Sequence, residues 1–219
     1  MAIPLLEAID IAGKTITADA LLTQRRLAEY LVAERQAHYH FTVKGNQPGL
    51  LADLVLYFQE RSEPEAVSVD SGHGRIETRK IWTSTELNDY LDFPWVGQAF
   101  VIERESIVKK TGKVSKETVY GVTSRTPEHA TAEKILHTNR NHWCIENSCH
   151  YIIDWNFDED RSRIRTGYGP ENISRLRRFA VGLIKSKGVP SVAQKMRQLS
   201  MNVRLVFDYL RMTKNSAVS

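Results

Sequence analysis

The residues with the clearest chemical potential lie in the stretch from Arg140 to Asp154. It reads Arg-Asn-His-Trp-Cys-Ile-Glu-Asn-Ser-Cys-His-Tyr-Ile-Ile-Asp, and no Pro or Gly interrupts it. We therefore expect a helix, on which side chains four residues apart share a face. On this helix His142, Glu146, His150 and Asp154 would form one polar stripe beside apolar residues. A carboxylate in that setting is a candidate metal ligand.

A second candidate ligand is Asp19, which follows the stretch 15–18, rich in β-branched residues. That stretch predicts a strand, and open α/β sheets place functional groups where strands end. An Asp at a strand end and a Glu on a helix can hold divalent metal for phosphoryl transfer, because carboxylate oxygens suit Mg²⁺ or Mn²⁺. Each acid also has a simpler explanation. Asp19 could cap the turn after it, and Glu146 could pair with Arg140 or His142 on its own helix.

A zinc site on the polar stripe is the rival interpretation. His142, Glu146 and His150 are all zinc-ligand types, but helical zinc motifs place their two His residues four apart. Here the two His residues are eight apart, which corresponds to roughly 12 Å of helix rise. Both rings cannot reach one ion at about 2 Å without a bend in the helix, so the sequence disfavours zinc.

The elements that would position Asp19 follow from hydrophobic periodicity. We expect, in order, a helix, a strand, a helix and a strand at residues 3–11, 15–18, 24–35 and 38–43. A strand, helix and strand in succession predict a parallel pair. The turn after the second strand, with Lys44, Asn46 and Gln47, should then lie on the same edge of the sheet as Asp19.

The whole chain predicts an α/β fold in four segments. Residues 1–62 would form the first part of the core, and residues 63–125 an antiparallel β insertion with alternating polar and apolar residues. Residues 126–186 would hold the Glu-bearing helix and the rest of the core. Residues 187–219 would form a helical, basic C-terminal segment.

Positive charge is concentrated near the C-terminus. Residues 161–219 contain 13 Lys and Arg against 2 Asp and Glu, a net of +11, and residues 1–160 contain 17 against 24, a net of −7, which sum to the formal +4. A basic segment on an otherwise acidic chain suggests a polyanionic partner. A solvated pair of basic helices would have the same composition.

Membrane and oxidising locations are disfavoured. No apolar run approaches the roughly 18 residues of a membrane span, and the first residues lack the pattern of a signal peptide. Cys144 and Cys149 would point to different faces of the expected helix, so a disulfide between them is geometrically poor. We therefore expect no membrane association and a reducing cytoplasm.

Five motifs, in this order, resemble the ISAs-type group of bacterial insertion-sequence transposases. They are Ile-Thr-Ala-Asp19-Ala-Leu-Leu-Thr-Gln24, Lys44-Gly-Asn46-Gln47-Pro48, His73-Gly-Arg75-Ile-Glu77-Thr-Arg79, Arg140-Asn-His142-Trp143-Cys-Ile-Glu146-Asn147 and Phe157-Asp-Glu-Asp160-Arg161. The likeness covers residues 3–185. It implies a DDE transposase with an RNase H-like core, which moves DNA by metal-dependent cleavage and strand transfer.

The resemblance also implies roles for single residues. Asp19 and Glu146 would be the second and third acids of the Asp-Asp-Glu triad and would hold Mg²⁺ or Mn²⁺. The partner would be double-stranded DNA, at transposon ends and at the target, bound by a homo-oligomer or a single copy. Arginines would hold phosphates, His142 would replace an Arg contact to phosphate, and the turn 44–47 would orient the scissile strand. The residues expected to contact DNA are Lys44, Asn46, Gln47, His73, Arg75, Arg140, His142, Asn147, Arg161, Arg163 and Arg165.

The first catalytic Asp of this family lies upstream of the motif that contains Asp19. Asp10 is not expected to replace it, because Asp10 should lie in the helix before the Asp19 strand. We therefore expect the C-terminal part of a transposase, truncated and inactive, with the Asp19 strand at an exposed edge of an incomplete core. Two alternatives stay open: a DNA-binding protein without catalysis, and a different metal-dependent nuclease that uses Asp154 or Asp158.

Overall fold

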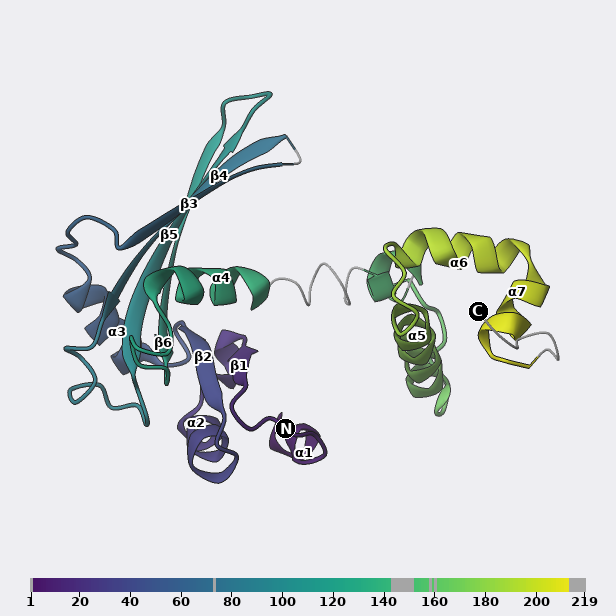
Figure 1. Cartoon of the computed structure of the whole chain (residues 1–219), viewed down its shortest axis with the longest axis horizontal. Helices are drawn as coiled ribbons and strands as arrows, with labels where there is room; N and C mark the ends of the chain where they lie inside the picture. Colours follow the sequence, from purple (N-terminus) through teal and green to yellow (C-terminus); the bar gives the residue numbers. More distant parts are fainter. Residues whose placement is uncertain (1, 73, 143–151, 158, 160, 213–219) are drawn as a thin grey trace. The chain divides into compact units, whose positions relative to one another are not determined.

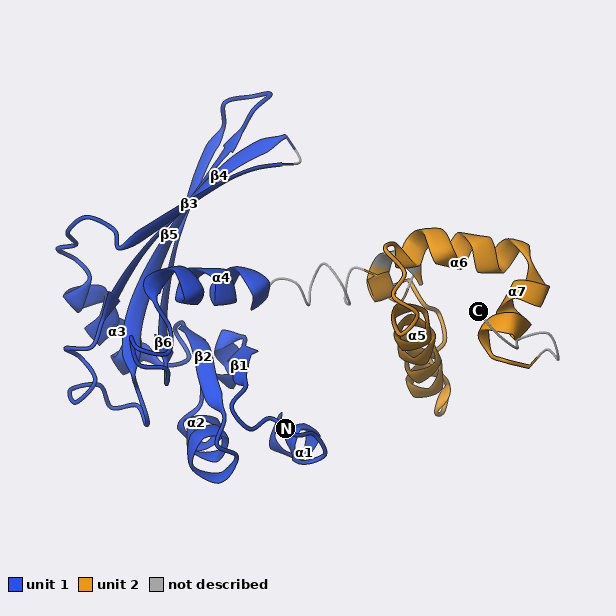
Figure 2. Ribbon diagram, viewed as in Figure 1, with its two compact units in different colours: residues 1–142 blue, residues 143–219 orange. Residues whose placement is uncertain are grey.

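The computed structural model describes residues 2–72, 74–142, 152–157, 159 and 161–212. The chain divides into two compact units, Met1–His142 and Trp143–Ser219 (Figure 2). Each unit is described by itself. Of the sequence predictions, those on His73, Glu146, Asn147, His150, Asp158 and both cysteines fall outside the described residues.

The first unit is built on one mixed six-stranded sheet with the order β1-β2-β6-β5-β4-β3 (Figure 1). The strands are β1 (Thr15–Ala18), β2 (His38–Val43), β3 (Ala66–Gly72), β4 (Arg75–Ser84), β5 (Gln98–Val108) and β6 (Val114–Thr123). β1 and β2 pair in parallel, as their sequence predicts, and every other neighbouring pair is antiparallel. The sheet therefore joins a parallel α/β unit to an antiparallel meander.

The predicted β-rich block does not form a sheet of its own. β6 pairs with β2, so that His40 lies opposite Thr123, and β6 also pairs with β5. The four antiparallel strands thus extend the sheet that carries Asp19. The four segment boundaries stay a prediction.

Helices cover both faces of this sheet. On one face, α2 (Arg25–Glu29), the π-helical turn Tyr30–Glu34 and α3 (Pro48–Tyr57) contribute to a core around the buried Tyr39, Phe41 and Leu54. On the other face, α4 (Ala132–His142) packs its Ile135 and Leu136 onto Ile81, Phe100 and Ile102. The inward residues of each strand alternate between these two cores, as a pleated strand requires.

The N-terminal helix is shorter than expected. α1 (Ala2–Glu7) ends before Asp10, so the prediction that Asp10 lies in a helix is wrong. The Arg35 guanidinium donates hydrogen bonds to the carbonyls of Leu6 and Ile9, at 2.9 and 2.6 Å, and these contacts satisfy carbonyls at the helix end. Asp10 instead lies in the connection to β1, where its Oδ1 accepts a bond from the Ala12 N–H at 3.1 Å. It therefore precedes β1, whereas Asp19 follows it.

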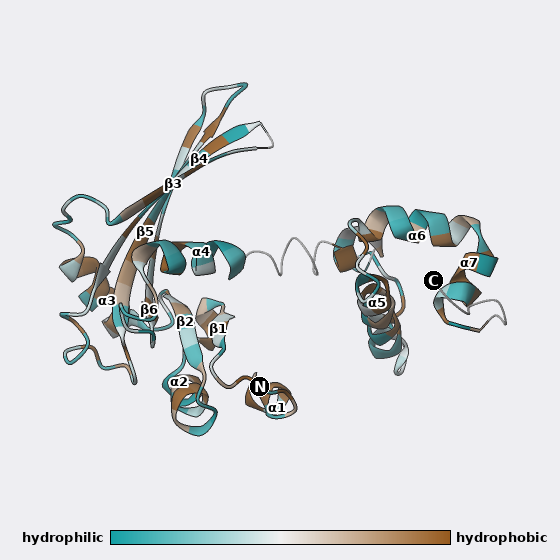
Figure 3. Ribbon diagram, in the orientation of Figure 1, coloured by the Kyte–Doolittle hydropathy of each residue, from teal (hydrophilic) through white to brown (hydrophobic). Residues whose placement is uncertain are grey.

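The described part of the second unit is helical. It contains the π-helical turn Ile152–Asn156, α5 (Gly169–Lys185), α6 (Val192–Met201) and α7 (Val203–Tyr209). Pro170 lies in the first turn of α5, and Ser191 and Asn202 cap α6 and α7 with their side-chain oxygens. Hydrophilic and hydrophobic residues alternate along these helices (Figure 3). In the described part of the chain, no helix combines the length and the apolar character needed to cross a bilayer.

Candidate functional site

Asp19 lies directly after β1, with its side chain exposed to solvent. Its Oδ1 accepts a hydrogen bond from the Ala20 N–H at 2.7 Å and caps the 3₁₀ turn Ala20–Leu22. The capping interpretation is therefore confirmed. It does not compete with metal binding, because a carboxylate has two oxygens and about four lone-pair sites.

The loop that carries Asp19 is tied to the loop after β2 by side-chain hydrogen bonds. The Asn46 amide donates to the carbonyl of Ala20 at 2.5 Å, and the Gln47 amide donates to the carbonyl of Thr23 at 2.9 Å. The buried Thr23 hydroxyl donates back to the carbonyl of Thr42, the penultimate residue of β2, at 2.7 Å. Three bonds thus fix the backbone next to Asp19.

These bonds give Asn46 and Gln47 a structural role that the sequence analysis did not assign to them. Their amide groups, expected to orient DNA, donate to the protein's own backbone. Thr23 could be expected from the sequence to cap the helix after it, but the residue before α2 is Gln24, and the Thr23 hydroxyl bonds to β2 instead. Lys44 is exposed at the start of the same loop, where its carbonyl accepts a bond from the Gln47 N–H at 3.0 Å.

The C-terminal end of α4 lies at the Asp19 end of β1. His142 Nδ1 is 3.1 Å from the hydroxyl of Thr17, two residues before Asp19. At the other end of the strand, Arg125 Nε donates to the hydroxyl of Thr15 at 2.9 Å. The segment before α4 therefore contacts the N-terminal end of β1, and α4 itself ends beside the C-terminal end of β1.

Beneath α4 lies a buried histidine that sequence reasoning did not single out. His40 is 2% exposed, and its ring stacks on Phe100 with centroids 4.6 Å apart. Its Nε2 is 3.4 Å from the Asn139 amide nitrogen. Burial lowers the pKa of His40 from 6.5 to about 3, with a smaller contribution from the charge of His142. The ring is therefore neutral near pH 7 and acts as a packing and hydrogen-bonding group.

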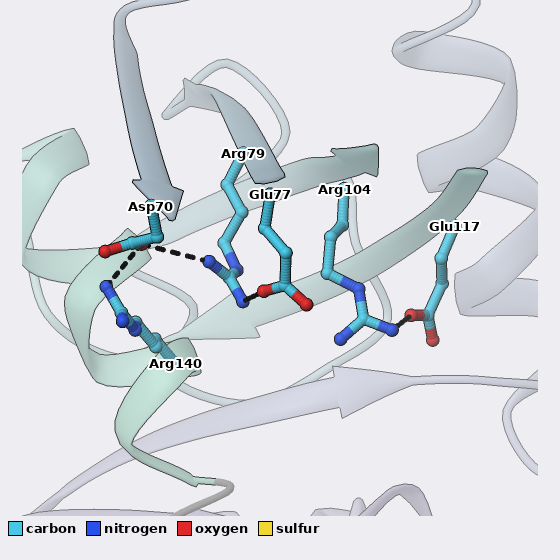
Figure 4. A network of polar contacts seen from close by, with 6 residues as sticks. All are labelled: Asp70, Glu77, Arg79, Arg104, Glu117 and Arg140. Carbon is cyan, nitrogen blue, oxygen red and sulfur yellow. Dashed lines mark hydrogen bonds and ion pairs between the residues drawn. The ribbon is translucent and has the colours of Figure 1, made fainter. Parts of the chain in front are cut away.

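Arg140, expected to hold a DNA phosphate, forms an ion pair within the first unit. Its Nη1 is 2.5 Å from Oδ2 of Asp70 on β3. The same oxygen lies 3.3 Å from Arg79, which also pairs with Glu77, so that the charges form one network (Figure 4). The Arg140 side chain is 49% exposed, so a phosphate could reach it only in competition with Asp70.

The other predicted DNA contacts lie in two places. Arg75 is exposed on β4 in the first unit. Arg161, Arg163 and Arg165 are exposed in the segment before α5 in the second unit. Within the first unit, the loops that carry Asp19, Lys44, Asn46 and Gln47 lie together, and His142 contacts the strand that leads to Asp19.

No cluster of three metal-ligating side chains exists among the residues that the structure describes. Glu146, the second acid expected to hold the metal, lies outside those residues. The zinc stripe, which includes Glu146 and His150, lies partly outside them for the same reason.

Comparison with known proteins identifies the relatives of this arrangement. Residues 1–172 match a family model described as "Transposase DDE domain". The chain is 33% identical over 216 residues to the Escherichia coli K12 protein named "H repeat-associated putative transposase YhhI", which covers 92% of this chain and 56% of that protein. It is 31% identical over 228 residues to "Putative transposase YncI" of Escherichia coli O157:H7, which covers 95% of this chain and 56% of that protein. The chain thus spans about half the length of these relatives.

Proposed function

The chain belongs to the transposase DDE domain family, and from this premise we propose that it acts in DNA transposition of an insertion sequence. The reaction would be metal-dependent cleavage of phosphodiester bonds followed by strand transfer. The proposal assigns Asp19 and Glu146 to the catalytic centre, and it places the protein in the cytoplasm, where its DNA substrate lies.

The observation that carries this assignment is the contact between His142 and Thr17. It places the last described residue of α4 beside the strand that ends at Asp19. Glu146 follows His142 by four residues, and an extended chain covers at most about 3.5 Å per residue. Four residues of chain thus reach at most about 14 Å, and the proposal requires Glu146 to approach the Asp19 end of the sheet within that reach.

The residues at this end suit a hard divalent cation. Asp19 offers an exposed carboxylate, and Asn46, Gln47 and Thr23 hold its backbone in place. Asp19 and Glu146 would hold Mg²⁺ or Mn²⁺ through oxygen atoms. When bound, such an ion supplies positive charge at the scissile phosphate. Lys44, exposed after β2, would add a further positive charge beside the DNA strand.

The finer family assignment is also part of the proposal. An RNase H-like core is supported by the parallel β1–β2 pair with Asp19 at its end and by α4 across the sheet. The five sequence motifs support the ISAs-type group. Double-stranded DNA would be held through the exposed Arg161, Arg163 and Arg165, in one copy or in a homo-oligomer.

A test that does not require activity is oxidative mapping of the metal site. The purified chain is incubated with Fe²⁺ in place of Mg²⁺, and ascorbate and peroxide are added. The positions at which the polypeptide backbone is cut are then read by mass spectrometry. Cuts are expected near Asp19 and near Glu146, and both should disappear in Asp19→Asn. Asp10→Asn is the matched control, because Asp10 lies before β1, and it should leave the cuts unchanged. Cuts confined to other acids, such as Asp154, would favour a different metal-dependent nuclease.

We further propose that a polypeptide of these 219 residues does not cleave DNA by itself. The resemblance implies three acids, of which these residues supply two, and the lost ligand would weaken charge stabilisation at the phosphate. Relative to a site with all three acids, we expect the cleavage rate to be lower by more than roughly a thousandfold, which corresponds to about 4 kcal/mol in the activation free energy. The assay is a nicked duplex with Mn²⁺, beside Asp19→Asn and Glu146→Gln. Cleavage that depends on both acids would refute this proposal and leave the transposase assignment intact, whereas DNA binding without metal mapping at Asp19 would favour a non-catalytic DNA-binding protein.

A further inference from the structure

The ends of the two long hairpins of the first unit form one surface. The turn between β3 and β4 and the turn between β5 and β6 project together from the sheet, away from α3 (Figure 1). The Lys109 N–H donates to the carbonyl of Gly74 at 2.8 Å, and its Nζ donates to the hydroxyl of Ser71 at 2.8 Å. These bonds hold the two turns side by side. We call Arg75, Lys109, Lys110 and Lys113, all exposed, the basic tip.

Charge along these hairpins is balanced in the middle and unbalanced at the tip. In the middle, Arg104 pairs with Glu117 at 2.7 Å and Lys116 with Glu105 at 3.0 Å. Towards the tip, residues 71–76 and 106–115 contain no Asp or Glu and include all members of the basic tip. No carboxylate of the described residues forms an ion pair with the basic tip.

The backbone of the tip is open to a large ligand. Gly74 and Gly112 occupy turn positions with φ of 75° and 65°, where glycine is favoured, and a Cβ at either residue would meet nothing within 4 Å. The β5–β6 turn is coloured teal to near white (Figure 3). A polyanion could therefore approach the backbone closely at Gly74 and Gly112.

The dimensions of the tip match a run of phosphates. Four neighbouring strands span three spacings of about 4.8 Å, or about 14 Å in all. One strand of duplex DNA carries a phosphate about every 3.4 Å along the axis, so this width corresponds to about four phosphates. The number of cations in the basic tip, four, is of the same order.

We propose that the basic tip binds the phosphate backbone of duplex DNA, through residues other than Asp19 and Arg161–Arg165. The proposal rests on the proposed function and deepens it. Lys and Arg contacts to phosphate fix position and carry no base information, so the tip would hold DNA of any sequence. It would add binding energy without touching the reacting phosphate.

The test compares two variants of the chain, each with four cations replaced by Gln. The tip variant is Arg75→Gln/Lys109→Gln/Lys110→Gln/Lys113→Gln. The control is Lys14→Gln/Arg26→Gln/Lys80→Gln/Lys134→Gln, with equal charge change at exposed positions elsewhere in the same unit. Affinity for a mixed-sequence duplex is measured against salt. We expect the slope of log affinity against log salt to become shallower by about 2–4 in the tip variant and by less than about one in the control.

Each outcome decides the matter. An unchanged slope in the tip variant, or an equal change in both variants, would overturn the proposal while DNA binding by Arg161–Arg165 stands. A wild-type chain that binds no duplex would overturn both this proposal and the DNA part of the proposed function. A tip variant that lost binding to RNA but kept binding to duplex DNA would also overturn the proposal and would assign the basic tip to RNA.

Lysine labelling of the unchanged protein gives a second reading. Acetylation of Lys109, Lys110 and Lys113 should be slowed by bound duplex, and high salt should remove the protection. Lys14 and Lys134 serve as internal references and should react equally with and without DNA. If DNA changed the acetylation rate of the tip lysines no more than that of the reference lysines, the proposal would be contradicted. This experiment does not depend on how any variant folds.

Discussion

The amide nitrogen of Asn46 lies 2.5 Å from the carbonyl oxygen of Ala20, the residue that follows Asp19. Asn46 comes from the loop after β2, so the position of the Asp19 carboxylate depends on a residue of the neighbouring strand's loop. The carboxylate of Asp19 itself accepts a hydrogen bond from the Ala20 N–H. The backbone on either side of this acid is therefore positioned by amide groups from a neighbouring loop.

Asn46→Ala should destabilise the chain and loosen the Asp19 loop. Ala20 is 5% exposed, so its carbonyl would lose a partner in a place that water reaches poorly. The carbonyl keeps its bond from the Thr23 N–H at 3.0 Å, so the variant loses one hydrogen bond of two. We expect a loss of about 0.5–1.5 kcal/mol in the free energy of unfolding, measured with urea. Gln59→Ala, at an exposed position after α3, is the control and should change stability by less than about 0.5 kcal/mol. Equal stabilities of wild type and Asn46→Ala would contradict the prediction.

The buried His40 should make the chain sensitive to acid. Burial, with a smaller contribution from the charge of His142, lowers its pKa from 6.5 to about 3, so the unfolded chain takes up a proton that the folded chain refuses between these values. Stability is then complete above about pH 6.5 and falls as the pH drops toward 3. Between pH 7 and pH 5 this one group should cost about 2 kcal/mol.

The matching measurement is urea unfolding of wild type and His40→Phe at both pH values. The phenyl ring can keep the stacking on Phe100 but cannot take up a proton, so the variant should lose most of the difference between pH 7 and pH 5. His38, whose pKa is also lowered by burial, should leave a smaller remainder. His137→Asn, at an exposed position, should behave as the wild type. If His40→Phe kept the full difference, the assignment to His40 would be wrong.

Arg161, Arg163 and Arg165 should contribute to DNA binding through phosphates. Replacing all three with Ala should make the slope of log affinity against log salt shallower by about 2–3, with little dependence on DNA sequence. Replacing Arg175, Arg177 and Arg178 of α5 with Ala is the control. It tests whether the loss of any three cations of the second unit changes the slope by the same amount. An unchanged slope in the first variant would assign DNA binding elsewhere in the chain.

Asp70 should weaken DNA binding by competing for Arg140. The ion pair is partly exposed and contributes about 0–1 kcal/mol to stability, so Asp70→Asn should fold normally. It should bind duplex DNA more tightly, by about two- to tenfold. The Arg140 guanidinium would be released for a phosphate, and one negative charge that repels phosphates would be removed. Asp70→Asn combined with Arg140→Gln should remove most of the gain. A gain that survives in the double variant would mean that Arg140 is not the contact.

Local patterns allow some of these features to be predicted and hide others. The strands at residues 15–18 and 38–43 and their parallel pairing follow from a short apolar run, a helix and a second run. The pairing of β2 with β6 does not, because it joins Phe41 to Val122 across a long stretch of chain. The early end of α1 depends on Arg35, whose contact with Leu6 no local pattern contains.

The candidate site divides in the same way. The position of Asp19 at a strand end and its capping role both follow from the local sequence. The roles of Asn46 and Gln47 do not, since an amide near a site can donate to DNA or to the backbone, and only the folded arrangement decides. The burial of His40 was equally hidden, because a His in an alternating strand is more often half exposed.

The order of the strands has a consequence for how the protein is made. β6 lies between β2 and β5, yet β2 ends at Val43 and β6 begins only at Val114. At about 5–20 residues per second, a ribosome needs roughly 4–14 seconds for that interval. During this time the β1–β2 pair, with the Asp19 loop already translated, lacks the strand that completes its sheet. The acid is thus synthesised early but acquires its surroundings late, when α4 emerges, so folding of the first unit is expected to be slow and to finish close to the end of its own synthesis.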